Sequence, residues 1–203
     1  MYETERKIFT TVRKRILAEI GSPVIDEFEK AIRKLIFEYN TTLHENRFIV
    51  GGSLEIIFCS LLISLGFNAL WLKERRFDIS IDGSKFSLKS NLSGNGDIRL
   101  INVLGNEVAE WREPTIFFIG GRGIFYADPE MEIRTYSTGD ATILKLKDLL
   151  EFNKRTSEWF INIKIPKKLK AKKNKIRTAS YDVVKSILNE ENCEILFKNL
   201  PEI

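Results

Sequence analysis

The segment GGSLEIIFCSLLISLG, residues 51–66, constrains the fold more than any other part of the chain. It is nearly all apolar and ends at Gly66. A helix with apolar side chains all around its axis has to be buried on most sides. The rest of the chain therefore has to cover this segment, and we expect it to be a central helix of the core.

Helices and strands around this segment can supply the cover. Residues 3–20 and 24–44 have apolar side chains at helical spacing and are separated by Gly21-Ser22-Pro23. Apolar and alternating runs predict strands at 69–73, 77–82, 84–90, 97–103, 115–120 and 122–127, with a weaker one at 131–136. The later pattern predicts a helix at 142–152, a strand at 158–165 and a closing helix, whole or broken, at 180–200. A mixed central β-sheet flanked by helices follows, in the α/β or α+β class.

The chain of 203 residues, 43% of them hydrophobic, suits a single domain with a sizeable core. We expect an N-terminal helical part at 1–45, a core at 50–127, and a C-terminal part at 157–203. The N-terminal helices are either a dimer surface or part of the core. No uncharged apolar run reaches about 18 residues, so no membrane span is expected. The charged N-terminus is unlike a signal peptide, and Cys59 and Cys193 are expected to be reduced, buried thiols of a cytoplasmic protein.

Positive charge is concentrated in one segment. Residues 167–177, KKLKAKKNKIR, contain seven Lys or Arg and no acid, whereas the whole chain has a net charge of +4. The remainder therefore carries a net charge of −3. A local basic segment on a slightly acidic protein is typical of phosphate binding, although a solvated tether would have the same composition.

Three charged residues interrupt otherwise apolar elements. Glu55 is the only charged residue in the 51–66 helix, Asp78 lies within RFDISID, and Lys89 lies within KFSLKS. The turn Asp82-Gly83 predicts a hairpin that pairs the last two runs. Each residue alone has an ordinary explanation: a first-turn acid favoured by the helix dipole, a solvent-facing strand residue, and an edge-strand lysine.

Together, the three residues can converge on one point. Carboxylate oxygens from a helix and a strand would hold Mg²⁺, a hard cation that prefers oxygen ligands. A lysine on the paired strand could orient a water molecule or stabilise charge on a phosphate. These are the components of metal-assisted phosphodiester hydrolysis.

The same residues resemble the PD-(D/E)XK nuclease superfamily, which includes many type II restriction endonucleases. The resemblance rests on Glu55 in GGSLEIIF, Asp78 in RFDISI, and Ser87-Leu88-Lys89 in KFSLKS, and covers roughly residues 50–127. It implies a restriction-endonuclease-like core, Mg²⁺ bound by Asp78 and Glu55, Lys89 at the attacking water, and a homodimer acting on double-stranded DNA.

The chain departs from the family motif at Ser87, where an Asp or Glu is usual. Some members place that carboxylate on a neighbouring helix, and Glu55 is the natural substitute. Asp82 and Glu74 are the alternatives for the second carboxylate. Ser87 itself is expected to line the site.

Further polar and basic residues are candidate DNA contacts. They are Asn91, Ser93, Asn95, Arg122, Lys167, Lys168, Lys170, Lys172, Lys173, Lys175 and Arg177. The single histidine, His44, argues against a histidine metal cluster, and no nucleotide-binding P-loop motif is present. We therefore expect a sequence-specific, Mg²⁺-dependent endonuclease of the restriction type. The alternatives are a structure-specific nuclease of the resolvase or repair type, and a decayed nucleic-acid-binding module, which Ser87 would favour.

Overall fold

Helices begin and end the chain, and strands occupy its middle. The computed structural model describes residues 1–203 except 42, 103–109, 139–140, 169–175 and 203. The helices are α1 (Glu3–Ala18), α2 (Pro23–Glu38), α3 (His44–Ser64), α4 (Leu146–Arg155), α5 (Ser180–Glu190) and α6 (Glu194–Lys198), with a 3-10 turn, η1, at Ser157–Trp159. The strands are β1 (Ala69–Trp71), β2 (Ile79–Ile81), β3 (Ser84–Asn91), β4 (Asp97–Asn102), β5 (Thr115–Ile119), β6 (Gly123–Ala127), β7 (Thr135–Thr138), β8 (Ala141–Lys145) and β9 (Phe160–Ile161).

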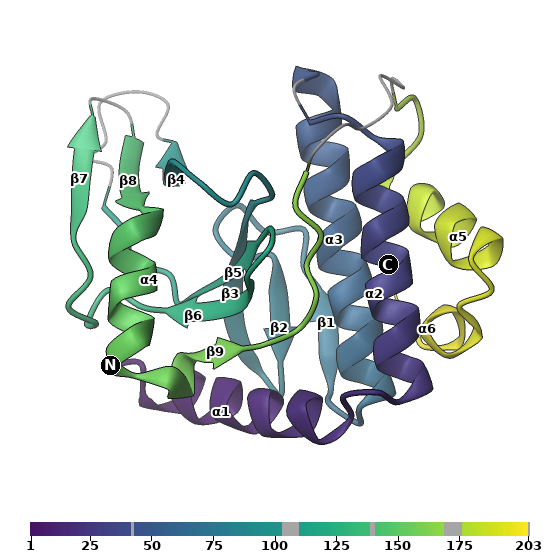
Figure 1. Ribbon diagram of the computed structural model, residues 1–203, viewed down its shortest axis with the longest axis horizontal. Coiled ribbons are helices and arrows are strands. Elements are labelled where there is room, and N and C mark those ends of the chain that lie inside the picture. The colour runs from purple at the N-terminus through teal and green to yellow at the C-terminus, as the bar shows by residue number, and fades with distance from the viewer. Residues whose placement is uncertain (42, 103–109, 139–140, 169–175, 203) are drawn as a thin grey trace.

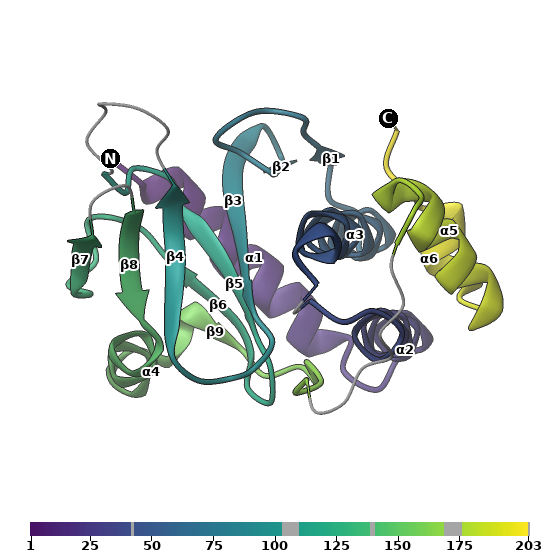
Figure 2. The same cartoon turned by 90° about the horizontal axis from the view of Figure 1, so that it is seen from above.

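A mixed six-stranded sheet forms the centre of the molecule, in the order β1-β2-β3-β5-β6-β9. Strands β3 and β5 are parallel, and the other neighbours are antiparallel. Figures 1 and 2 show α1, α2 and α3 against this sheet, with α5 and α6 beyond them. A second sheet, β4-β8-β7, and α4 lie on the other side. The predicted α/β class, a mixed sheet flanked by helices, is confirmed.

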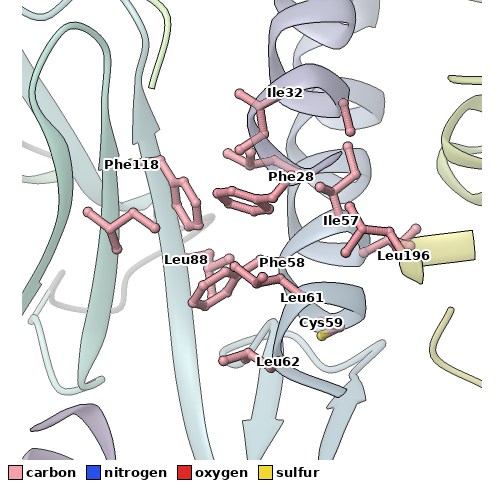
Figure 3. Close-up of a cluster of buried hydrophobic side chains, with 14 of the residues drawn as sticks. Phe28, Ile32, Ile57, Phe58, Cys59, Leu61, Leu62, Leu88, Phe118 and Leu196 are labelled. Carbon is pink, nitrogen blue, oxygen red and sulfur yellow. The ribbon is translucent and has the colours of Figure 1, made fainter. Parts of the chain in front are cut away.

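Helix α3 is the central helix that its composition predicts. Phe58, Leu61 and Leu62 are fully buried in the larger hydrophobic cluster shown in Figure 3, where Phe58 meets Phe118 of β5 edge-on at a ring-centroid distance of 5.1 Å. Within the described helices, α3 alone has the length and hydropathy of a membrane span, over Asn46–Ser64, and 56% of that stretch is buried inside the protein. The core helix of a soluble protein has the same properties, so this is weak evidence for a membrane.

The helix also starts earlier than predicted, at residue 44 rather than 51. Leu43 occupies the N-cap position and makes no side-chain capping bond. Tertiary contacts of Asn46 hold the first turns: its amide nitrogen donates to the Asn40 carbonyl at 3.1 Å, and its amide oxygen accepts from the Ile176 backbone at 3.0 Å. Because this start depends on distant residues, no local signal marked it.

Two later elements differ from the prediction. The expected helix at 142–152 begins as strand β8, and α4 starts only at Leu146, because β8 is the central strand between β4 and β7. The strand expected at 158–165 is limited to the two residues of β9. The closing helix is broken, as α5 and α6, at Asn192, whose φ is +54°.

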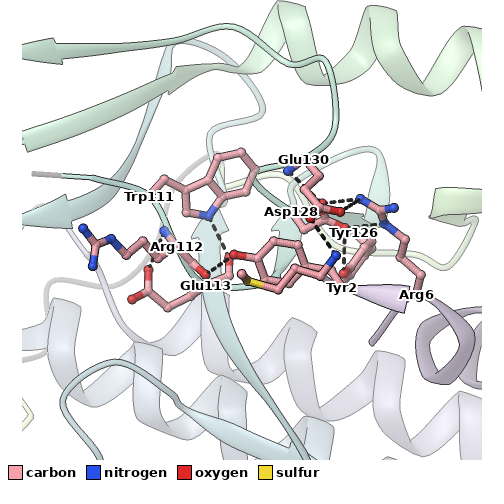
Figure 4. A network of polar contacts seen from close by, with 9 residues as sticks. Tyr2, Arg6, Trp111, Arg112, Glu113, Tyr126, Asp128 and Glu130 are labelled. Carbon is pink, nitrogen blue, oxygen red and sulfur yellow. Dashed lines mark hydrogen bonds and ion pairs between the residues drawn. The ribbon is translucent and has the colours of Figure 1, made fainter. Parts of the chain in front are cut away.

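Helix α1 is fixed to the end of β6 by a partly buried ion pair, shown in Figure 4. Arg6 donates through Nε and Nη2 to the two oxygens of Asp128, each at 2.7 Å, and Asp128 is fully buried. The Tyr126 hydroxyl donates to the same carboxylate at 3.0 Å. The apolar face of α1 also lies in the core, so this helix is core structure, and dimerisation through it stays a prediction.

Cys59 and Cys193 are both buried and free, which confirms the prediction of unpaired thiols. Burial raises the pKa of Cys193 to about 11. Burial raises the pKa of Cys59 as well, and a thiol that stays protonated at neutral pH is a poor nucleophile.

Candidate active site

The hairpin β2–β3 brings Asp78, Ser87 and Lys89 together. Asp82 and Gly83 both have positive φ, +47° and +87°, as the predicted tight turn requires. The Asp78 backbone N–H donates to the Phe86 carbonyl at 2.9 Å, which extends the pairing one residue beyond β2. Asp78 is thereby placed beside Ser87 and within reach of Lys89.

Within the described residues, all the polar contacts of the Asp78 side chain reach one carboxylate oxygen. Its Oδ2 accepts from the Ser87 hydroxyl at 3.0 Å and from the Leu88 backbone N–H at 2.6 Å. Lys89 Nζ lies 3.8 Å from the same atom. These bonds fix the carboxylate and leave Oδ1 available to a ligand. Ser87 thus orients Asp78 instead of supplying a charge.

Glu55 belongs to the same cluster. Its Oε2 accepts from the indole N–H of Trp71 on β1 at 2.9 Å, and Oε1 makes no hydrogen bond within the residues described. Burial raises the Glu55 pKa to about 7, and the negative charge of Asp78 adds to the rise, whereas the Trp71 bond and Lys89 oppose it. The structure therefore brings the two acids and the lysine within electrostatic reach of one another.

The ordinary explanation of Glu55 is wrong, because α3 begins at His44 and Glu55 lies in its middle. The dipole of a helix end acts only over the first turn and cannot account for an acid eleven residues further on. The two alternative acids are engaged elsewhere. Asp82 accepts from the Asn68 backbone at 3.0 Å, and Glu74 pairs with Lys85 at 2.6 Å. Glu55 is the better partner for Asp78.

The oxygen atoms of Glu55 and Asp78 fit a magnesium ion, which often uses one or two carboxylates and completes its shell with water and substrate phosphate. Two partly buried acids that repel each other are stabilised by a cation between them. In the described part of the chain, no group of three or more His, Cys, Asp or Glu is placed to hold a metal. A metal at this point would complete its coordination shell with ligands other than a third such side chain, for example water or substrate phosphate.

A cleft of about 430 Å³ opens next to Lys89. Four cations line it: Arg47, Lys89, Arg99 and Lys168. The cleft has one acidic residue in its lining, Asp97, whose carboxylate accepts from the Tyr136 hydroxyl at 2.6 Å. A concave surface with this charge attracts anions.

Several predicted DNA contacts line this cleft, namely Asn91, Ser93, Asn95 and Lys168. The first two mainly shape the loop after β3: the Asn91 amide donates to the Asn95 carbonyl at 2.8 Å, and Ser93 donates to Asn91 Oδ1 at 2.7 Å. Arg122, Lys167 and Arg177 are exposed but do not line the cleft. The predicted contacts Lys170, Lys172, Lys173 and Lys175 lie outside the described residues.

Sequence reasoning missed Arg47, Arg99 and Thr41 in the lining of the cleft. The sequence did contain an indication for Arg99, because this residue alternates with the apolar residues Ile98 and Leu100 in β4. The sequence contained no such indication for Arg47, because no local pattern marks the start of α3.

No protein-family model, curated protein or solved structure matches this chain.

Proposed function

We propose that the protein is a Mg²⁺-dependent DNA endonuclease with a restriction-endonuclease-like core. The observation that carries this proposal is the gathering of Asp78, Lys89 and Glu55 at one point beside a basic cleft. Asp78 and Glu55 would hold the metal through the oxygens that the protein leaves available. Bound Mg²⁺ would neutralise phosphate charge and lower the pKa of an attacking water.

Lys89 would act on the nucleophile and the phosphate. Its ammonium group lies 3.8 Å from Asp78 Oδ2, which is too far for a direct hydrogen bond. That position lets Nζ donate hydrogen bonds to a water molecule or a phosphate oxygen. Ser87 would keep Asp78 in place by its hydroxyl bond.

Double-stranded DNA is the substrate that the family resemblance implies, cut at specific sites as by type II restriction endonucleases. A palindromic site would be matched by a two-fold homodimer, because the symmetry of the protein then equals that of the DNA. The slightly acidic remainder of the chain favours DNA contact through the cleft and the basic segment.

A digest of plasmid and phage DNA, in Mg²⁺ and in EDTA, tests this proposal. We expect discrete fragments only with Mg²⁺, and a loss of at least about 100-fold in rate for Asp78→Ala and Lys89→Ala. Lys85→Ala is the matched control, because Lys85 lies on the same strand but pairs with Glu74. Full activity of Asp78→Ala, or loss of activity in the Lys85 variant alone, would refute the site.

A decayed DNA-binding module is the second candidate, and Ser87 at the acidic position of the motif is the observation that favours it. Binding without cleavage, unaffected by Mg²⁺ and weakened by salt, would support this candidate over the nuclease. The same reactions should include a branched DNA, because cleavage of that substrate alone would identify a structure-specific nuclease.

A further inference from the structure

Part of the lining of the cleft comes from two segments that are far apart in the sequence. Lys168 follows β9 along the chain, and its backbone N–H donates to the Leu92 carbonyl at 2.8 Å. Its Nζ donates to the Thr41 hydroxyl at 2.7 Å. Arg47, in the first turns of α3, donates through Nε to the Thr41 carbonyl at 2.9 Å. Thr41 thus holds both cations at one place.

These two cations have no acidic partner among the residues described. Neither Arg47 nor Lys168 forms an ion pair there, and the acid in the lining, Asp97, is bonded to Tyr136. Burial, together with the charge of Arg47, lowers the pKa of Lys168. Two like charges held together without a counter-ion are unfavourable by themselves and become favourable when an anion joins them.

The remaining groups suit a phosphate. Arg47 uses Nε within the protein, so its two Nη groups keep their N–H donors, and a guanidinium can bind phosphate through two parallel bonds. The Thr41 hydroxyl accepts from Lys168 and keeps its own proton to donate. The described lining contains no aromatic side chain, so the cleft offers bases no stacking surface and fits a sugar–phosphate backbone better.

We propose that Arg47, Lys168 and Thr41 form a second phosphate site, which holds another phosphate of the strand whose scissile phosphate lies at Lys89. This inference rests on the proposed function, because Lys89 defines the scissile position. The cleft volume of about 430 Å³ is within the range of pockets for drug-sized ligands, which suits one strand's backbone and not a whole duplex. The site would fix the direction in which that strand runs.

The salt dependence of DNA binding tests the site directly. Binding of a labelled duplex is measured by fluorescence anisotropy in EDTA, so that no cleavage occurs, for wild type, Arg47→Gln and Lys168→Gln. Loss of one phosphate contact should weaken binding about tenfold and reduce the slope of log K against log salt by about 0.9, or by about 0.7 for a single strand. Lys7→Gln on α1, which removes an exposed charge away from the cleft, is the matched control.

A second measurement locates the phosphate. A neutral methylphosphonate replaces one phosphate at a time along the DNA. Wild type should lose affinity at the scissile position and at one further position, and Lys168→Gln should be insensitive at that further position only. Lys168→Arg, which retains the charge, should behave like wild type if its fold is intact by thermal unfolding.

The outcomes separate the two proposals. If wild type binds and cuts DNA while Arg47→Gln and Lys168→Gln keep the slope of the Lys7 control, the second phosphate site is overturned and the nuclease stands. If wild type binds no DNA, both proposals fail. If binding shows the second site but DNA remains intact in Mg²⁺, the nuclease fails and the phosphate site is kept as part of a binding module.

Discussion

Replacing Glu55 with glutamine should stabilise the protein at neutral and alkaline pH and leave its stability nearly unchanged below pH 4.5. The folded protein raises the Glu55 pKa from the ordinary 4.5 to about 7, chiefly because the carboxyl is buried. Between these two values the folded state binds a proton that the unfolded state has released. Stability therefore falls as pH rises from 4.5 to 7 and stays lower above 7.

The magnitude follows from the size of the shift. Each pKa unit corresponds to about 1.4 kcal/mol, so the ionised carboxylate costs about 3 kcal/mol at pH 8. Water reaches part of Glu55, so this value is an upper bound. The glutamine side chain of the Glu55→Gln variant would keep an oxygen to accept the Trp71 N–H, and the substitution should remove the charge without removing that bond.

Urea unfolding of wild type and Glu55→Gln from pH 4.5 to 8.5 measures this effect. The difference in unfolding free energy should grow from near zero to between about 1 and 3 kcal/mol in favour of the glutamine variant. Trp71 fluorescence should titrate near pH 7 in wild type only. A difference that does not change with pH, or a wild type that is the more stable at pH 8, would refute the raised pKa. Mg²⁺ should stabilise wild type at pH 8 more than the variant, because only a carboxylate attracts the cation.

Further substitutions test the packing of α3 and of α1. Gly52→Ala should lower the free energy of unfolding by about 1–2 kcal/mol, because the new Cβ would lie 2.7 Å from the Ser180 hydroxyl oxygen on α5. Gly51→Ala should raise it by about 0.5–1 kcal/mol through helix propensity, because a Cβ at that position meets nothing within 4 Å. Equal effects in urea unfolding would contradict this contrast. Arg6→Met should lower the free energy of unfolding by about 3 kcal/mol, measured by thermal unfolding, because the Asp128 carboxylate stays buried without its cation. The double variant with Asp128→Asn should recover part of this loss, because the buried charge is then removed. A loss below about 1 kcal/mol would show that the ion pair contributes little.

The part of the site that could be predicted from sequence is the part set by local structure. Asp78 and Lys89 lie eleven residues apart on one hairpin, and the turn Asp82-Gly83 fixes their register. The period of two in a strand then determines which side chains share a face. Local structure does not place Glu55, because its position in the site depends on how α3 packs against β1. The early start of that helix, set by contacts with a segment 130 residues away, also hid the evidence against a dipole role.

The cleft could not be predicted, for a physical reason that also bears on its function. Its cations come from the start of α3, from β3 and β4, and from the segment after β9, and only tertiary packing brings these together. Arg47 and Lys168 are held close together there, and two like charges at short range cost electrostatic energy in the folded protein. Local folding needs do not explain why Lys168 and Arg47 are held on a common residue, Thr41. An anion that arrives from outside would offset that cost, and an extended polyanion passing Lys89 would reach both cations along the same cleft.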